Sequence, residues 1–219
     1  MSTPSDNTVL APGITVLGVA GSPRRKATHY AVNEALEYAA GQHGVAVDYY
    51  TLHRKDIGFC RHCDYCIRKR QGCIIEDDMA ELYPKLLAAD AWILGSPVYQ
   101  GQISGQLKAA LDRCRALVAK DQHAFRDKVG AGLCVGGDRS GGQEPALLAL
   151  IGFFIINEMV PVGGGSFGAN LGAAVWSRDK GAEGVKADEE GLAASHRVVD
   201  RLVRMARLLR GSPGGAEAR

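Results

Sequence analysis

The chain has 219 residues, a formal net charge of +2 and 46% hydrophobic residues. This length allows a single domain with a substantial core, and the small net charge gives no broad basic field for nucleic acid or a membrane surface. The polar residues 1–12 lack the apolar segment of a secretory signal, and no apolar run approaches the roughly 20 residues that span a bilayer. We therefore expect a cytoplasmic protein whose first 12 residues are disordered.

Apolar runs alternate with helical patterns along the chain, which predicts an α/β fold with a parallel sheet. The expected strands cover residues 14–20, 45–52, 91–96, 129–136 and 158–163. The expected helices cover residues 28–42, 77–90, 104–118, 143–157 and 188–210. A glycine-rich loop is expected from the last strand to Val185, and a disordered tail over 211–219. The pattern predicts one domain, residues 13–210, built on a doubly wound five-stranded parallel sheet.

The loop after the first strand, "GSPRRKAT", combines features that bind phosphate. Gly21 allows a tight turn, and Ser22 and Thr28 supply hydroxyl groups. Arg24 adds positive charge beside a helix start, where unpaired N–H groups attract anions. The Gly-Lys-Ser/Thr ending of a Walker loop is absent, and so is the dinucleotide motif G-x-G-x-x-G. We predict a phosphate site of another kind, with a capped helix and exposed basic residues as the alternative.

The loop after the third strand begins with "GSPVYQG". Pro97 and Gly101 favour a tight turn whose backbone polar groups can face a ligand, and Tyr99 can supply apolar area beside a ring. Further along, we expect Ser104 to cap the next helix. We expect Arg113 to serve packing or an interface. Because ligands of doubly wound sheets bind beyond the carboxyl ends of the strands, this loop and the first should meet at one site.

The loop after the fourth strand, "GGDRSGGQE", contains four glycines that permit close approach of backbone to a flat ligand. We assign Gly136, Gly137 and Asp138 to the same site. Glu144 is expected only to complement the N-terminus of the following helix.

Four of the six cysteines lie in one short loop after the second strand, with the pattern C-x2-C-x2-C-x6-C: Cys60, Cys63, Cys66 and Cys73. Disulfides are rare in the cytosol, and zinc sites usually show two pairs of ligands a dozen or more residues apart. The spacing is nearer to compact runs that bind a [4Fe–4S] cluster. Cys114 and Cys134 lie in an expected helix and strand, and we interpret them as buried thiols.

The loops after the first and third strands resemble those of the flavodoxin-like NAD(P)H-dependent FMN reductases. The third-strand segment "GSPVYQGQISGQLKAALDR" carries most of this resemblance, whereas Ala27 departs from the family's Asn or Ser. The resemblance implies that FMN is held by Ser22, Arg24, Thr28, Ser96, Pro97, Val98, Tyr99, Gly101, Gly136, Gly137 and Asp138.

Together with the cysteine loop, these motifs resemble the iron–sulfur flavoprotein family. This resemblance implies FMN together with a [4Fe–4S] cluster in the loop 58–75, held by Cys60, Cys63, Cys66 and Cys73. It also implies an oxidoreductase that couples two-electron flavin chemistry to one-electron transfer. The implied partners are NAD(P)H, a ferredoxin-type carrier or a small-molecule substrate, and further copies of the chain in a homodimer or homotetramer.

Three alternatives stay open at this point. The cysteine loop could bind zinc or no metal. The chain could be an FMN-dependent dehydrogenase of a small cyclic acid such as 2-amino-4-deoxychorismate in antibiotic biosynthesis, with Trp176 and Arg178 facing the substrate. It could also be a metal-binding redox sensor without turnover. Because the cofactors would carry the chemistry, no acid–base residues are predicted.

Overall fold

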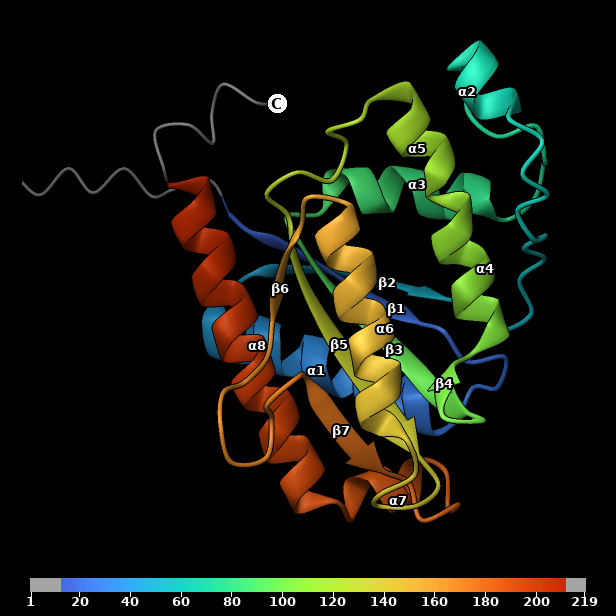
Figure 1. The fold of residues 1–219 in the computed structure, drawn as a ribbon. Coiled ribbons are helices and arrows are strands. Elements are labelled where there is room, and N and C mark those ends of the chain that lie inside the picture. The colour runs from blue at the N-terminus through green and yellow to red at the C-terminus, as the bar shows by residue number, and fades with distance from the viewer. Residues whose placement is uncertain (1–12, 212–219) are drawn as a thin grey trace, which may run out of the picture.

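The computed structural model describes residues 13–211 and shows a parallel sheet between two layers of helices (Figure 1). The disorder predicted for residues 1–12 and 212–219 falls outside the described residues. The strands are β1 (Thr15–Ala20), β2 (Ala46–Thr51), β3 (Ala91–Tyr99), β4 (Gln102–Ile103), β5 (Val129–Gly136), β6 (Val160–Val162) and β7 (Ala173–Trp176). The helices are α1 (Ala27–His43), α2 (Tyr65–Lys69), α3 (Met79–Ala88), α4 (Gly105–Arg113), α5 (Arg115–Lys120), α6 (Gln143–Ile156), α7 (Ala182–Lys186) and α8 (Glu189–Arg210).

The sheet has the order β2-β1-β3-β5-β6, with parallel pairing along this path. This is the order of flavodoxin-like doubly wound sheets, so the predicted flavodoxin-like α/β fold is confirmed. The predicted number of five strands was too low, because β7 pairs with β5 and the short β4 pairs antiparallel with β3. Strand β5, which has neighbours on both sides, is buried along its whole length. Such burial is typical of a parallel strand covered by helices on both faces, and it explains the uninterrupted apolar run "VGAGLCV".

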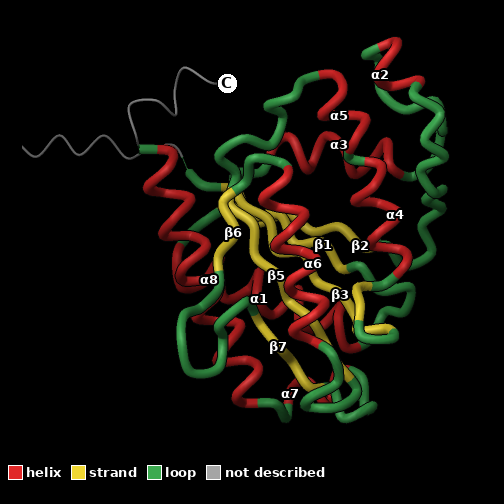
Figure 2. The backbone as a smooth tube through the Cα atoms, in the orientation of Figure 1, coloured by secondary structure: helices red, strands yellow, loops and turns green. Residues whose placement is uncertain are grey.

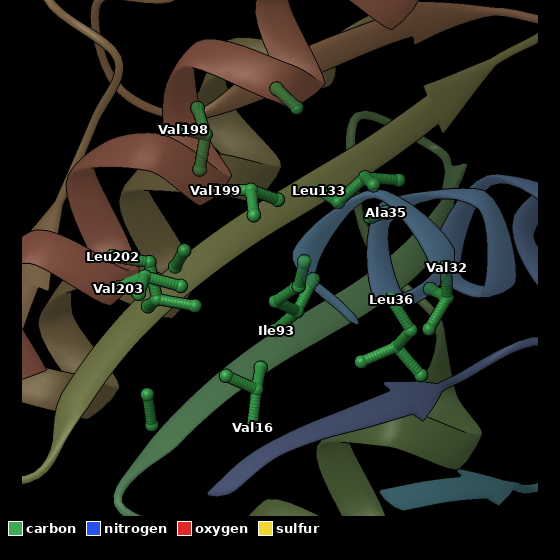
Figure 3. Packing of buried hydrophobic residues seen from close by; sticks show 14 of the residues in the cluster. Val16, Val32, Ala35, Leu36, Ile93, Leu133, Val198, Val199, Leu202 and Val203 are labelled. Carbon is green, nitrogen blue, oxygen red and sulfur yellow. The ribbon is translucent and has the colours of Figure 1, made fainter. Parts of the chain in front are cut away.

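Helices α1 and α8 cover one face of the sheet, and α3, α4 and α6 cover the other. Figure 3 shows the first layer, in which α8 contributes Val199 and Leu202, α1 contributes Ala35, and the strands contribute Ile93 and Leu133. All of these side chains are almost completely buried. The helices are therefore fixed to the sheet by apolar packing, and the loops at the strand ends have a rigid base.

The prediction of a simple glycine-rich loop from the last strand to Val185 was wrong. The segment contains β7 and α7. Strand β6 pairs with the first half of β5, and β7 pairs with its second half. The fifth position of the sheet is therefore shared by two short strands, so that the chain leaves the sheet and returns to it (Figure 2).

The helix predicted over 104–118 is interrupted, because α4 ends at Arg113 and α5 begins at Arg115. Cys114 lies at this junction and is buried. On α6, by contrast, Leu148, Ile155 and Ile156 are exposed, and the association of chains through such a face stays a prediction. None of the helices within residues 13–211 is long and apolar enough to cross a membrane.

Candidate flavin cleft and cysteine loop

A cleft of about 570 Å³ lies at the carboxyl edge of the sheet, where the loops after β1, β3, β5 and β7 meet. The first loop contributes Ser22, Arg24, Arg25, Lys26 and Thr28 to its lining. The predicted phosphate residues Ser22, Arg24 and Thr28 thus line one end of the cleft together, because they belong to one loop and the helix start that follows it.

The end of the cleft at α1 is suited to an anion. Helix α1 begins after Lys26 without a side-chain cap, and its first turn has no acidic residue. Its first N–H groups are therefore open to a ligand. The hydroxyl-bearing residues Ser22 and Thr28 are 5% and 2% exposed, so they are held in place by their surroundings. The Ser22 hydroxyl accepts a hydrogen bond from the Arg24 N–H at 3.1 Å, which keeps the loop turned toward the helix.

The carboxyl end of β3 forms the apolar wall of the cleft. Pro97, Val98 and Tyr99, which the sequence placed in a loop, are the last residues of this strand and line the cleft. Ser96 does not line it, because its side chain is completely buried. The Ser96 hydroxyl donates to the Pro97 carbonyl oxygen at 2.8 Å and accepts from the Ser104 N–H at 2.9 Å. Ser96 therefore fixes the backbone of residues 97–104 without facing the cleft.

Gly101 also lies outside the lining, and its backbone adopts φ +73°. That conformation strains any residue with a side chain. A Cβ on the neighbouring Gly142 would come within 2.8 Å of the Gly101 Cα. Both glycines are therefore needed where the loops after β3 and β5 touch.

From the loop after β5, Gly137 lines the cleft, whereas Gly136 and Asp138 do not. Gln143, at the start of α6, donates to the Asp138 carbonyl oxygen at 2.7 Å and accepts from the Gly141 N–H at 2.8 Å. The turn is thus held closed by a buried side chain. A flavin contact of Ser96, Gly101, Gly136 or Asp138 stays a prediction.

The segment after β7 forms a wall that the sequence analysis missed. Ser177, Asp179, Lys180, Gly181 and Ala182 line the cleft. The Ser177 N–H and hydroxyl both donate to the Gly136 carbonyl oxygen, at 2.8 and 3.0 Å. The sequence signal was the short apolar run "AAVW" before this segment, which pairs with β5.

Trp176 and Arg178 are not part of the cleft lining. The guanidinium groups of Arg139 and Arg178 lie 5.1 and 4.4 Å from the ring centre of Trp176. The Trp176 indole donates to the Gly137 carbonyl oxygen at 2.6 Å. The tryptophan therefore holds two loops together, and this arrangement gives no support to a substrate site at Trp176 and Arg178.

The four clustered cysteines lie in the long loop between β2 and α3, which runs beside α4 and α5 (Figure 2). Cys66 is on α2 and buried, Cys63 is exposed, and Cys60 and Cys73 are intermediate. All are free thiols. Within residues 13–211, no three histidine, cysteine or acidic side chains are gathered closely enough to hold a metal ion. By the chemistry of its donors, four thiols without a disulfide, the loop fits an iron–sulfur cluster, although the sulfur atoms are not gathered around one point.

The other two cysteines differ from these four. Cys114 and Cys134 are buried, and burial raises the pKa of each thiol to about 12. Both thiols therefore stay protonated near neutral pH. This agrees with their interpretation as packing residues.

The base of the cysteine loop is closed by a buried ion pair between Arg113 and Asp77. Their side chains are 0% and 3% exposed. Arg113 Nη1 donates to Asp77 Oδ2 at 2.6 Å and to the Gly58 carbonyl oxygen at 2.9 Å. Arg113 Nη2 donates to Asp77 Oδ1 and to the Ile75 carbonyl oxygen, both at 3.0 Å. One side chain therefore binds both ends of the loop, rather than serving only packing or an interface.

This ion pair predicts a dependence of stability on pH. Burial alone would raise the pKa of Asp77, but hydrogen bonds from Arg113 and from the Gly58 and Met79 N–H groups hold the pKa below its ordinary value. The stabilisation that comes from a lowered pKa is fully present above about pH 4. It is lost as the pH falls through the pKa of the carboxyl in the folded state. We expect Asp77→Asn to lower the free energy of unfolding near neutral pH by about 2 kcal/mol.

The difference between Asp77→Asn and the wild type should shrink below about pH 4, because the wild-type carboxyl then becomes protonated. Urea unfolding from pH 3 to 7 measures it, with Asp112→Asn as the control because the Asp112 carboxylate is 47% exposed in a surface pair. A difference that does not change with pH would contradict the prediction.

The fold and the cleft define a class: a flavodoxin-like protein with a cleft at the carboxyl edge of its sheet, lined in part by cationic side chains. A family model described as NADPH-dependent FMN reductase matches residues 14–174. An iron–sulfur flavoprotein of Methanocaldococcus jannaschii is 54% identical over 196 residues, which cover 90% of this chain and 98% of that relative. An iron–sulfur flavoprotein of Archaeoglobus fulgidus is 48% identical over 196 residues, which cover 90% of this chain and 99% of that relative.

Two solved structures show the same fold. A WrbA-like flavodoxin from Agrobacterium tumefaciens has a TM-score of 0.62 at 19% identity, over 90% of this chain and 99% of that one. RosB has a TM-score of 0.70 at 16% identity, over 94% of this chain and 84% of its own. The chain belongs to the iron–sulfur flavoprotein family, within the NADPH-dependent FMN reductases, and is a flavin-dependent oxidoreductase.

Proposed function

We propose that this oxidoreductase couples two-electron chemistry at FMN to one-electron transfer through a [4Fe–4S] cluster. The observation that carries the proposal is the position of four free thiols in one loop, beside the helix that starts at the flavin loops. A flavin exchanges electrons in pairs or singly, whereas a cluster passes one at a time. The names of the relatives, iron–sulfur flavoproteins, support the same assignment.

The proposed FMN site uses the two ends of the cleft differently. The phosphate would lie at the start of α1, against Ser22, Thr28 and Arg24. The flavin ring would lie against Pro97, Val98 and Tyr99, where the lining is apolar. FMN supplies hydride acceptance when bound, and we propose NAD(P)H as the hydride donor because the matching family model is described as NADPH-dependent.

Thr28→Val should weaken FMN binding at least about tenfold, because a hydrogen bond to a charged group contributes about 1.5–3 kcal/mol. Valine preserves the shape of this buried position but lacks the hydroxyl. Titration of the FMN-free protein with FMN measures the effect. Thr51→Val is the control, because Thr51 lies on β2 and outside the cleft. An unchanged dissociation constant would place the phosphate elsewhere.

The cysteine loop also supports a proposal for the electron-carrying partner. Phe59, Ile67 and Ile74 are exposed, and basic side chains lie between them. An apolar surface among positive charges fits an acidic protein such as a ferredoxin-type carrier. Arg68→Glu with Lys69→Glu should slow reduction by such a carrier about tenfold or more at low salt and leave NAD(P)H oxidation unchanged. Equal carrier rates in stopped-flow mixing would contradict this surface.

An anaerobic visible spectrum, with iron, acid-labile sulfide, zinc and FMN measured per chain, tests the proposed function. We expect about four iron and four sulfide with one FMN. FMN accompanied by zinc, or by no metal, would overturn the cluster and leave an FMN reductase. The two other candidates, a dehydrogenase of a cyclic acid and a redox sensor, have no structural observation that favours them.

A further inference from the structure

Helix α4 joins the flavin loops to the base of the cysteine loop. At its first end, the Ser104 hydroxyl donates to the Gly21 carbonyl oxygen at 2.5 Å, and the Ser104 N–H donates to the Ser96 hydroxyl at 2.9 Å. At its last residue, Arg113 binds the carbonyl oxygens of Gly58 and Ile75. At the rise of an α-helix, the distance along the axis from residue 104 to residue 113 is about 14 Å.

At the flavin end, the start of α4 packs so closely against Gly21 that this position has no room for a side chain. A Cβ added to Gly21 would lie 2.7 Å from the Leu107 Cβ and 2.9 Å from the Gly95 carbonyl oxygen. The Leu107 N–H donates to the Ser104 hydroxyl at 3.1 Å and completes the helix cap. The start of α4 is therefore fixed against the two loops that form the proposed FMN site.

At the other end, the hydrogen bonds of the Arg113 side chain go to Asp77 and to two backbone carbonyl oxygens. Arg113 and Asp77 form an ion pair. The Asp77 carboxylate also accepts hydrogen bonds from the Gly58 N–H at 2.8 Å and the Met79 N–H at 3.1 Å. A guanidinium group can satisfy a carboxylate and two carbonyl oxygens together, which a lysine ammonium cannot do with the same geometry. The ends of the loop are thus held before any ligand gathers its thiols.

We propose that Arg113 is a positioning residue that holds the base of the cysteine loop at a fixed place relative to the flavin loops, so that the thiols can gather around a cluster without disturbing the FMN site. The proposal rests on the proposed function for the identity of the group in the loop. Asp77 is its partner, and α4 transmits the position. A further contact from this side, Arg115 with Asp64 at 2.6 Å, is partly exposed and binds the middle of the loop.

The first measurement uses metal-free protein. Arg113→Met should speed amide hydrogen exchange across residues 58–76 at least tenfold, with little change in β1 and β3. Lys108→Met is the matched control, because it removes a positive charge from the same helix where the pair with Asp112 is exposed. Equal exchange of the loop in Arg113→Met and the wild type would overturn the proposal whether or not the protein binds a cluster.

The second measurement follows anaerobic reconstitution with iron and sulfide. Arg113→Met should keep less than a third of the wild-type iron per FMN and bind FMN with unchanged affinity. Arg113→Lys should recover part of the iron, and the electron paramagnetic resonance signal of the iron it retains should differ in its g values from the wild type. Iron content and g values equal to the wild type in Arg113→Met would overturn the role in positioning.

Arg113→Met leaves the Asp77 carboxylate buried without its partner, so this variant could fail to fold. The double variant Arg113→Met with Asp77→Leu removes both charges and still lacks the bonds to Gly58 and Ile75. It should reproduce both loop effects, and normal iron content in it would overturn the proposal. A wild type that takes up no iron would instead contradict the proposed function and leave the exchange result to decide the role of Arg113.

Discussion

Cys66→Ala is expected to hold less than a tenth of the wild-type iron and sulfide per FMN, while the FMN content stays unchanged. A [4Fe–4S] cluster uses four thiolate ligands, and the loop contains four free thiols. Cys66 is the buried one of the four and lies on α2. No residue of α2 lines the flavin cleft. The effect should therefore be confined to iron and sulfide, measured chemically after anaerobic purification.

Cys134→Ala is the control for this variant. Cys134 is buried in β5 and lies outside the cysteine loop, and burial raises the pKa of its thiol to about 12. The variant should lose about 1 kcal/mol of stability through lost packing and keep its iron. Full iron content in Cys66→Ala would show that this thiol is not a ligand. Equal loss in both variants would show that iron content follows stability.

The strands could be predicted from the sequence because parallel strands buried on both faces appear as continuous apolar runs. The segments around Leu17, Ile93 and Leu133 are of this kind, and the structure confirms each as a strand. The meeting of the loops after β1 and β3 also follows from the strand order alone. These parts of the site depend on local pattern and on topology, both of which the sequence contains.

The role of Arg113 could not be predicted in this way. Its partner Asp77 is 36 residues away along the chain, and a charged residue at the end of a helix is usually exposed. Nothing local distinguishes it from Lys108, which is on the same helix and forms a surface pair. The spacing of the cysteines predicts them as ligands, but the place of their loop relative to the loops at the cleft depends on this distant pair.

The segment after β6 was interpreted as a loop because its glycines obscure two short elements. Strand β7 and helix α7 have four and five residues, which is too short for a clear periodic pattern. Several of the glycines are required by close packing rather than by flexibility. The most severe case is Gly184, where an added Cβ would lie 1.6 Å from the Ser177 carbonyl oxygen.

Gly184→Ala is expected to lower the free energy of unfolding by more than about 4 kcal/mol, since so close a contact with backbone leaves no room for side-chain adjustment. It should also weaken FMN binding, because Gly184 of α7 lies against Ser177, and the segment from Ser177 to the start of α7 supplies one wall of the cleft. Urea unfolding and FMN titration measure the two effects.

Gly41→Ala is the matched control, because this glycine lies within α1 and its Cβ would meet no atom within 4 Å. Helix propensity predicts a gain of about 0.5–1 kcal/mol for it, with FMN binding unchanged. If Gly184→Ala were as stable as this control, α7 could move away from Ser177 at little cost. The wall after β7 would then be an adjustable part of the cleft, and its lining residues, Lys180 among them, would not be held in place for the ligand.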